Sequence, residues 1–365
     1  MLYLLEYYHL FELRDTIFKR GELMQKEHTQ AHVLLDEKGN LRQPGYAKRM
    51  VGIYHRDHIQ ASKLRIKEWD YYLICNDNYG VALTMADNAY MGMMSLSILD
   101  FKERKEHTKS LINLLPMGKL NFPSTSMSGE IHYTDKNCQF SFVTKDNERI
   151  LHAQMKNFID KKPITVDFIL TDEPEESIVI ATPFNKDKHF YYNQKINNMK
   201  AKGQVVFDNQ TLTFNDIDST ATLDWGRGVW TYDNTWYWGS GSGYVDGKAF
   251  GFNIGYGFGD ATHASENMLF YEGKAHKLED VTFNIPHVDG HEDYMKPWTF
   301  TSSDSRFEME FTPLLDRYAK TSVGIIFSLQ HQVFGLFNGT AILDDGTKIK
   351  LHDYLGFAEK VWNKW

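Results

Sequence analysis

The sequence predicts an all-β protein with two β-domains, and three observations lead to this prediction. Most of the chain alternates apolar and polar residues in short runs that end at Gly, Asn or Asp, a pattern typical of antiparallel barrels and sandwiches. The chain has 365 residues, whereas one domain holds roughly 150. The polar segment Pro183–Ala201 interrupts the strand rhythm, so we place the boundary at residue 198, between domains 1–198 and 199–365. The same segment would equally suit a buried strap between the domains.

Three β-hairpins are the clearest predicted elements. The first spans Val229–Phe258, where aromatic residues occupy even positions on both sides of the turn-rich string GSGSGYVDGK. The second turns at Glu272–Lys274 and the third at Asp344–Gly346, each between two alternating runs. Further strands are predicted from the same alternation at Tyr71–Cys75, Gly80–Ala86, Gly129–Thr134, Gln139–Thr144, Ile150–Phe158, Ile164–Thr171 and Gly203–Phe214.

Helical patterns are few in this sequence. One candidate helix covers residues 2–20 at the start of the chain. The other is the closing segment Leu351–Trp365, in which apolar residues recur at steps of three and four and form one stripe. We expect this C-terminal helix to pack across the second β-domain.

Charge and composition exclude several classes of protein. A net charge of −8, from 40 basic and 48 acidic residues, supplies no positive field for a phosphate backbone, so we expect no nucleic-acid partner. The sequence shows no apolar run of about 18 residues and no signal peptide, so we expect no stable membrane insertion. Cys75 and Cys138 are too few for a disulfide scaffold and agree with a cytoplasmic location, although a single bridge between them is an alternative.

The usual signatures of cofactor-dependent enzymes are missing from the sequence. It contains no phosphate-binding loop, no nucleophile elbow, no paired cysteine motifs for zinc and no protein-kinase motifs. The glycines of segment 251–259 alternate along a strand and precede no helix, so a dinucleotide site is not predicted. The string PHVDGHEDY, with His287 and His291, fits a solvated loop better than a metal site. We therefore expect neither a cofactor nor a bound metal.

One region of the C-terminal half combines aromatic rings with acids and bases. It covers the strings DWGRGVWTYDNTWYWGSGSG and GFNIGYGFGDATHASENMLFYEGKAHKL. Inside an apolar barrel a carboxylic acid can stay protonated and donate a proton, while tryptophan faces stabilise a developing carbocation. We therefore predict Asp224 or Glu266 as the acid, with Arg227 tuning it. The predicted ligand-binding residues are Trp225, Trp230, Trp236, Trp238, Asn253, Tyr256, Asn267 and His276.

These residues suit a cofactor-independent hydratase, isomerase or cyclase that acts on a hydrophobic unsaturated molecule. A carrier or sensor of lipids or isoprenoids is an alternative, because barrels readily enclose such ligands. A carbohydrate-active enzyme or sugar-binding module is a second alternative, in which indoles stack on sugar rings and Asp224 and Glu266 form the carboxylate pair. A third is purely structural: tryptophans that fill a core around an Asp224–Arg227 ion pair. The expected partner is thus a small hydrophobic molecule or a sugar, and the oligomeric state stays open.

Eight ordered strings resemble those of a bacterial family, domain of unknown function 2804. They are PGYAKRM, EWDYY, the T-x-A-D-x-x-Y string Thr84–Tyr90, SIVIATPF with HFYYNQKIN, DWGRGVW, WYWGSGSG, FNIGYGFGD, and SENMLF with GKAHKL. The resemblance covers about residues 22–360. The family looks remotely similar to AttH-like proteins, which include carotenoid 1,2-hydratases and resemble tocopherol cyclases and certain fungal Diels–Alder cyclases. This similarity implies two tandem lipocalin-like antiparallel β-barrels with a cavity for an apolar ligand, and it transfers no catalytic residue.

Overall fold

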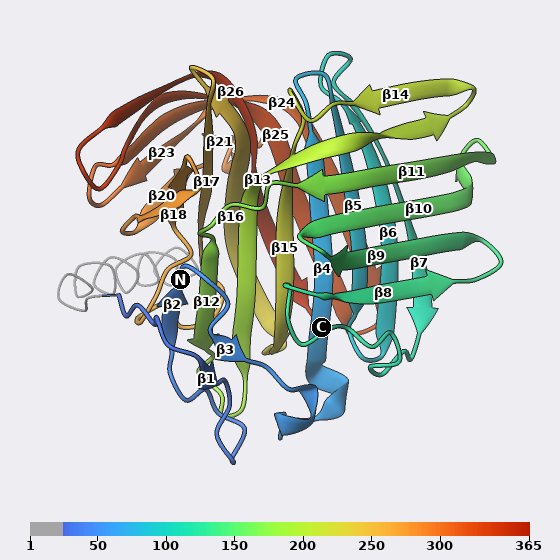
Figure 1. Cartoon of the computed structure of the whole chain (residues 1–365), viewed down its shortest axis with the longest axis vertical. Coiled ribbons are helices and arrows are strands. Elements are labelled where there is room, and N and C mark those ends of the chain that lie inside the picture. Colours follow the sequence, from blue (N-terminus) through green and yellow to red (C-terminus); the bar gives the residue numbers. More distant parts are fainter. Residues whose placement is uncertain (1–24) are drawn as a thin grey trace.

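The described part of the chain, residues 25–365 of a computed structural model, consists almost entirely of β-strands (Figure 1). Two large antiparallel sheets, of 13 and 9 strands, contain most of them. Within residues 25–365 the helical elements are two 3₁₀ turns, Arg56–His58 and Lys63–Arg65. The predicted all-β fold is therefore confirmed, as two curled antiparallel sheets in tandem. The helix predicted over residues 2–20 lies outside the described residues.

The first sheet curls over on itself and encloses an apolar core. Its strands are β2 (Gly45–Ala47), β4 (Ile66–Cys75), β5 (Tyr79–Asp87), β6 (Met91–Asp100), β7 (Lys105–Leu114), β8 (Gly129–Thr134), β9 (Cys138–Lys145), β10 (Glu148–Ile159), β11 (Lys162–Thr171), β12 (Ile178–Pro183), β13 (Phe190–Phe207), β14 (Gln210–Phe214) and β15 (Thr220–Val229). The main hydrogen-bonded order is β7-β6-β5-β4-β15-β13-β11-β10-β9-β8. In Figure 1, β8–β11 cross in front of β4–β7, so this sheet forms a half-barrel.

The second sheet forms the other half-barrel, with its own apolar core. Its strands are β16 (Asp233–Val245), β17 (Lys248–Tyr256), β18 (Met268–Tyr271), β19 (Lys274–Lys277), β20 (Val281–Asn284), β23 (Trp298–Ser302), β24 (Phe307–Val323), β25 (Ile326–Ile342) and β26 (Lys348–Lys364). Their order is β19-β18-β17-β16-β26-β25-β24-β23-β20. Two small sheets complete the fold: β1 (His32–Val33) with β3 (Gly52–Ile53), and β21 (His287–Val288) with β22 (His291–Glu292).

Burial differs between the outer and the central strands of the first sheet. The outer strands β10 and β11 alternate buried and exposed residues, because one face lies on the core and the other faces water. The central strands β5 and β15 are buried on both faces along almost their whole length. The second sheet covers the outer face of β15, through contacts of β13 and β15 with β16 and of β13 with β17. On β5, Ala82 belongs to the same apolar cluster as Phe334 and Phe357 of the second sheet. A seam between the half-barrels results, and it carries the features described below.

The chain passes from the first sheet to the second between Val229, where β15 ends, and Asp233, where β16 begins. Residue 198 lies inside β13, a strand of 18 residues. The polar side chains Gln194, Lys195 and Asn197 on this strand are buried, because β13 contacts both sheets. The polar segment that interrupts the sequence pattern is therefore a strand of the seam.

The three predicted hairpins are confirmed, but the aromatic residues of the first one lie on two faces. β16 and β17 join through the two-residue turn Asp246–Gly247, which pairs Trp238 with Gly255. An even residue of one strand is thus opposite an odd residue of the other. Because side chains alternate between faces, Trp238 points to the first sheet while Phe252 lies in the core of the second half-barrel. Even numbering on both strands therefore does not indicate a shared face.

The predicted C-terminal helix is wrong, because this segment is strand β26. A register shift against β25 and a positive φ of 48° at Asp353 change the phase of the apolar pattern. Beyond this irregularity Gly356, Phe357, Ala358 and Glu359 are all buried, since β26 has the second core on one face and the seam on the other. The bulge and the burial of both faces together produced the apparent helical spacing.

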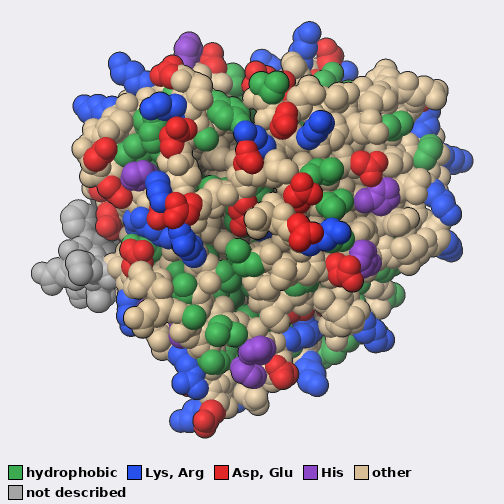
Figure 2. Space-filling model, viewed as in Figure 1, with side chains coloured by type: hydrophobic (Ala, Val, Ile, Leu, Met, Phe, Trp, Pro, Cys, Tyr) green, Lys and Arg blue, Asp and Glu red, His purple; other side chains and the backbone are tan. Residues whose placement is uncertain are grey.

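The surface shows mixed charges. In Figure 2 acidic and basic side chains are interspersed over the visible face, with no large area of one sign. Among residues 25–365 there is no helix with the length and apolarity that a membrane crossing requires. Cys75 and Cys138 are both free thiols.

Gly226 on β15 is required by the close approach of an indole at the seam. A Cβ atom at this position would lie 1.9 Å from a ring carbon of Trp69. That ring cannot move aside easily, because it stacks on Tyr191 and meets Trp230 edge to face. The contact couples β15 to the aromatic packing of the seam.

We expect Gly226→Ala to lower the free energy of unfolding by about 2–3 kcal/mol, as for other overpacked cores. Urea denaturation measures the change. Gly243→Ala on β16 is the matched control, since its new methyl group would lie 3.4 Å from the Tyr354 ring, an ordinary contact. Equal midpoints for the two variants would contradict the tight packing at Gly226.

Candidate functional site

A buried cluster of charged side chains lies at the seam. The Lys195 ammonium on β13 is 3.0 Å from the Asp224 carboxylate on β15 and 3.8 Å from the Glu266 carboxylate, in the loop after β17. Asn193 donates a further hydrogen bond of 2.6 Å to the Asp224 carboxylate. The structure thus brings together the two acids predicted from the sequence and places a lysine between them.

The strand geometry explains why these side chains meet. Lys195 and Asp224 lie opposite each other on antiparallel neighbours, so both point to the same face of the first sheet. The loop after β17 returns over that face and brings in Glu266. Gly255 leaves room for it, because a Cβ there would lie 2.7 Å from the Glu266 carboxylate oxygen.

Trp238 forms one wall of the cluster. The Lys195 ammonium lies 3.9 Å from the centre of its ring, a cation–π contact. The Trp238 indole N–H donates to the Asn253 side chain at 2.7 Å, and Asn253 donates to Glu266. These contacts hold the indole face against the charged groups.

Glu359 on β26 adds a third carboxyl group that the sequence analysis did not identify. It accepts hydrogen bonds from the Trp236 indole at 3.1 Å and from the amides of Gln330 and Gln332 at 3.2 and 3.1 Å. Burial raises the pKa of Glu359 to about 7, although the Trp236 hydrogen bond and the positive charge of Lys195 oppose this shift. At neutral pH a large fraction of Glu359 is therefore protonated and able to donate a proton.

Glu266 has the same tendency as Glu359. Burial raises the pKa of Glu266, and the negative charge of Asp224 adds to this effect while Lys195 opposes it. The Asp224 and Glu266 side chains keep 11% and 9% of their surface accessible, so a water-sized molecule reaches both. The cluster thus combines acids of raised pKa with a lysine-paired carboxylate, an arrangement that is enriched at functional sites.

Arg227 does not tune Asp224, which corrects that part of the prediction. The two residues are three positions apart on one strand, so they point to opposite faces. Arg227 faces the core of the first half-barrel, where it pairs with Asp70 at 2.9 Å and lies 4.0 Å from the centre of the Trp225 ring. Lys195 occupies the place next to Asp224 that we expected for Arg227.

Two other predicted ligand-binding aromatics also lie away from the cluster. Trp225 is fully buried in the core of the first half-barrel, on the same face of β15 as Arg227. Tyr256 stacks on Tyr237 at 4.5 Å and packs against the core of the second half-barrel. Neither ring faces Asp224.

The remaining tryptophans pack against other rings at the seam. Trp230 lies 5.9 Å from Trp236 and 5.2 Å from Trp69, and both Trp230 and Trp236 contact Phe258 edge to face. Trp238 contacts Tyr71 in the same way at 5.9 Å. Trp230 therefore touches the indoles of Trp69 and Trp236, whereas Trp238 packs against a tyrosine ring.

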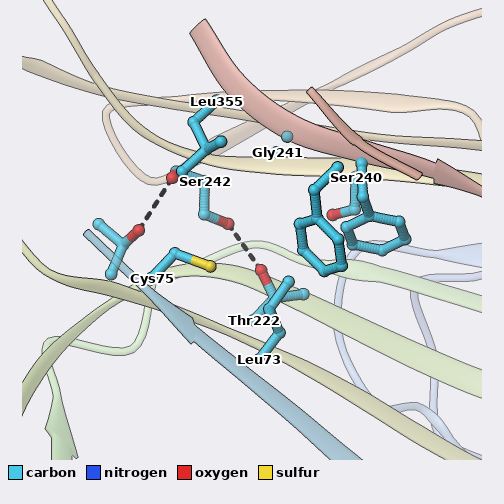
Figure 3. A pocket seen from close by; sticks show the side chains of 11 residues that line it. Leu73, Cys75, Thr222, Ser240, Gly241, Ser242 and Leu355 are labelled. Carbon is cyan, nitrogen blue, oxygen red and sulfur yellow. Dashed lines mark hydrogen bonds between the residues drawn. The ribbon is translucent and has the colours of Figure 1, made fainter. Parts of the chain in front are cut away.

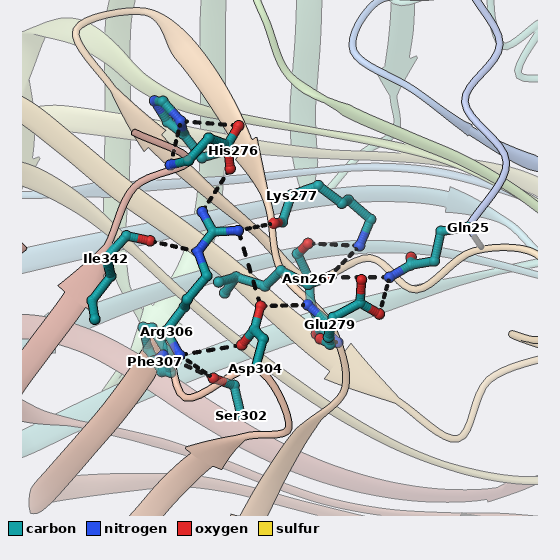
Figure 4. Close-up of polar contacts among 12 residues, drawn as sticks. Gln25, Asn267, His276, Lys277, Glu279, Ser302, Asp304, Arg306, Phe307 and Ile342 are labelled. Carbon is teal, nitrogen blue, oxygen red and sulfur yellow. Dashed lines mark hydrogen bonds and ion pairs between the residues drawn. The ribbon is translucent and has the colours of Figure 1, made fainter. Parts of the chain in front are cut away.

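Asn267 and His276 serve a polar network beside the cluster (Figure 4). Asn267 accepts a hydrogen bond from the backbone N–H of Gly255 and donates one to the backbone oxygen of Glu279. It thereby holds the loop that carries Glu266. His276 lies near Asp344 at the rim, together with Arg306. Between them Lys277 donates to three oxygens, and burial lowers its pKa to about 7. This network holds both neighbours of Glu266 in the chain, Ser265 and Asn267.

A cavity of about 20 Å³ lies elsewhere in the seam, among Leu73, Thr222, Ser242 and Leu355 (Figure 3). Thr222 and Ser242 share a hydrogen bond of 2.7 Å at its edge. This volume is sufficient for one water molecule, and the hydroxyl groups supply partners for it. The cavity is too small for an organic ligand.

Sequence reasoning missed Lys195 and Glu359 for identifiable reasons. Lys195 is in the string HFYYNQKIN, whose polar character indicated an interruption of the strands. Glu359 is in the segment predicted as a helix. The aromatic run Phe190–Tyr192 just before Lys195, which is typical of a buried strand, would have been the available signal in the first case.

Fold and site together define an all-β protein of two half-barrels with an acid–lysine cluster buried between them. The chain belongs to the family described as Domain of unknown function (DUF2804), whose model matches residues 25–365. The resemblance based on eight sequence strings is thus confirmed. A comparison with curated proteins gives no match.

Several solved structures are similar to this chain at low sequence identity. A putative AttH from Nitrosomonas europaea is 14% identical, with a TM-score of 0.49 over 84% of this chain and 95% of that one. Kievitone hydratase from Nectria haematococca is 11% identical, with a TM-score of 0.46 over 92% and 98% of the two chains. CghA in complex with Sch210972 is 9% identical, with a TM-score of 0.43 over 93% and 97%.

Proposed function

We propose that this protein is a cofactor-independent enzyme that transfers protons to and from a hydrophobic unsaturated molecule. The reaction takes place at the buried group of Lys195, Asp224, Glu266 and Glu359, called the Lys195 cluster below. The reaction class is hydration, isomerisation or cyclisation of an olefin. The observation that carries the proposal is the Glu359 carboxyl group, whose pKa burial raises to about 7, next to the indole of Trp236. A general acid works best when its pKa is close to the working pH.

Each group of the cluster has a role in this proposal. Glu359 donates a proton to the olefin, which leaves a carbocation beside the indoles of Trp236 and Trp238. Asp224, held by Lys195 and Asn193, then accepts a proton from a water that adds to the cation, or from the cation itself. Glu266 also lies beside Lys195, with its carboxyl group 3.8 Å from the ammonium. Lys195 thus takes the role of tuning the carboxyl group that we predicted for Arg227.

The burial of the cluster favours an apolar substrate over a sugar. The three carboxyl groups lie between two sheets among aromatic rings, whereas a glycosidase needs its carboxylate pair in a cleft that admits a sugar ring. The seam rings contact one another, so the substrate has to separate Trp236 from its neighbours to reach Glu359. A flat hydrocarbon chain fits such an insertion better than a hydrated sugar.

We expect conversion of at least one compound from a panel of farnesol, geranylgeraniol and oleic acid, with deuterium from D₂O in a new C–H bond. Mass spectrometry of the products measures it. Glu359→Gln and Asp224→Asn should each lower the rate about 10²–10⁴-fold, the usual contribution of a general acid or base. Asp246→Asn, in the exposed β16–β17 turn, is the matched control and should keep the full rate.

The carrier alternative has a different outcome in the same experiment. A panel compound that is bound without conversion, with binding kept in Asp224→Asn and lost in Trp238→Ala, would overturn the enzyme in favour of a carrier. Loss of folding in both acid variants, seen as a large fall in melting temperature, would make the cluster structural. Native mass spectrometry of the purified protein shows directly whether a small molecule is retained.

A further inference from the structure

A second hollow lies at the open end of the first half-barrel, remote from the Lys195 cluster. Its volume is about 250 Å³. One wall comes from Tyr79 and Ile98 on β5 and β6, and the other from Ile159, Phe207 and Leu212 on β10, β13 and β14. The two walls belong to the crossing layers of the same sheet (Figure 1). Barrel mouths of this kind are a preferred place for small ligands.

The walls of this groove are apolar and in contact with the core. All five wall side chains are half-buried and pack against the first core on their inner side. Phe207 is held edge to face by Phe158 at 5.7 Å, so its ring is fixed in place. The apolar walls offer water little to bind. A small apolar molecule that displaces this water therefore binds favourably through the hydrophobic effect.

The size of the groove limits its occupant. A cavity of roughly 150 Å³ holds a benzene molecule. The groove, at about 250 Å³, therefore accommodates one aromatic ring with a short side chain. It is too small for a long polyene, so its ligand differs from the proposed substrate of the seam.

The charge at the rim indicates which polar group the occupant carries. Asp100 and Glu103 contribute carboxylates, Lys105 is paired with Glu103 at 3.7 Å, and His107 contributes an imidazole. Asp100 accepts a hydrogen bond from the Glu103 backbone N–H, and no cation in residues 25–365 lies within 4.0 Å of its carboxylate. A cationic group at the rim would therefore complete the Asp100 ion pair.

We infer that the mouth of the first half-barrel binds a small aromatic amine, with the ring between Ile98 and Phe207 and the ammonium at Asp100. The ring replaces water at the apolar walls. The ammonium forms a charge-assisted hydrogen bond with the Asp100 carboxylate. This site is independent of the proposed chemistry at the seam.

Calorimetric titration of the full chain with three matched probes tests this inference. We expect 2-phenylethylamine to bind at least tenfold more tightly than neutral 2-phenylethanol, and 3-phenylpropanoate not to bind. Asp100→Asn should bring the amine down to the affinity of the alcohol and leave the alcohol unchanged. Asp246→Asn, an exposed carboxylate of the second half-barrel, is the matched control and should leave all affinities unchanged.

A second variant tests the groove itself. Gln210 is an exposed residue of its lining, so Gln210→Trp narrows the groove without disturbing the core. We expect loss of both amine and alcohol binding, with an unchanged melting temperature. Three results would each overturn the inference. The first is equal affinity for the amine and the alcohol, and the second is no binding of either probe at a concentration of about 10 mM, weaker than millimolar affinity. The third is full binding of the probes by Gln210→Trp.

Discussion

Arg227→Met is expected to lower the free energy of unfolding by about 3–5 kcal/mol, the usual cost of breaking a buried ion pair. The guanidinium is fully buried, and its Nη1 donates to Asp70 at 2.9 Å and to the backbone oxygens of Trp69 and Gly226. Without Arg227, the Asp70 carboxyl group is left without this counter-charge in a site where burial already raises its pKa. Urea denaturation at pH 7 measures the loss.

The double variant Arg227→Met/Asp70→Asn separates the ion pair from simple packing. Removal of the unpaired acid should recover about 1–3 kcal/mol, the range of coupling energies between contacting residues. Arg49→Met is the control, because Arg49 forms an ion pair with Glu175 at the surface, and its midpoint should stay near that of the wild type. Strictly additive losses in the double variant would show that the charge pair contributes nothing.

Glu359→Gln is expected to remove a fall in stability that the wild type shows as the pH rises to neutral. The folded-state pKa of Glu359 is about 7, and its ordinary value is 4.5. Between these values the folded protein holds a proton that the unfolded chain releases, so the stability of the wild type falls as the pH rises through this window. The shift corresponds to roughly 3 kcal/mol. The glutamine variant lacks this loss.

Urea midpoints of both proteins at pH 5, 6, 7 and 8 measure the effect. The difference between variant and wild type should grow from pH 5 to pH 7 and then level off. Glu292→Gln is the matched control, because Lys360 holds the pKa of Glu292 below its usual range, although burial opposes this shift. The change in stability that the titration of Glu292 causes therefore lies below the tested range of pH 5 to 8. Parallel curves for Glu359→Gln and the wild type would contradict the raised pKa and, with it, the acid in the proposed mechanism.

The site was predictable only in part. Asp224, Glu266, Trp238 and Asn253 come from aromatic-rich strings that stand out in the sequence, and the structure brings them together. Arg227 was adjacent in sequence, but the strand period places it on the opposite face. Adjacency along a strand therefore does not predict contact between side chains.

The sequence by itself determined the all-β class, the hairpins and the family, because turn residues and strand alternation are local signals that act over a few positions. The tertiary structure alone decided which residues form the seam. Lys195 and Glu359 lie in strand segments that are buried on both faces, where the alternation that identifies a face is lost. Lys195 meets Asp224 through the pairing of β13 with β15, 29 positions apart. Glu359 reaches the cluster only through the packing of the two half-barrels, 135 positions along the chain from Asp224, a relation that no local pattern carries.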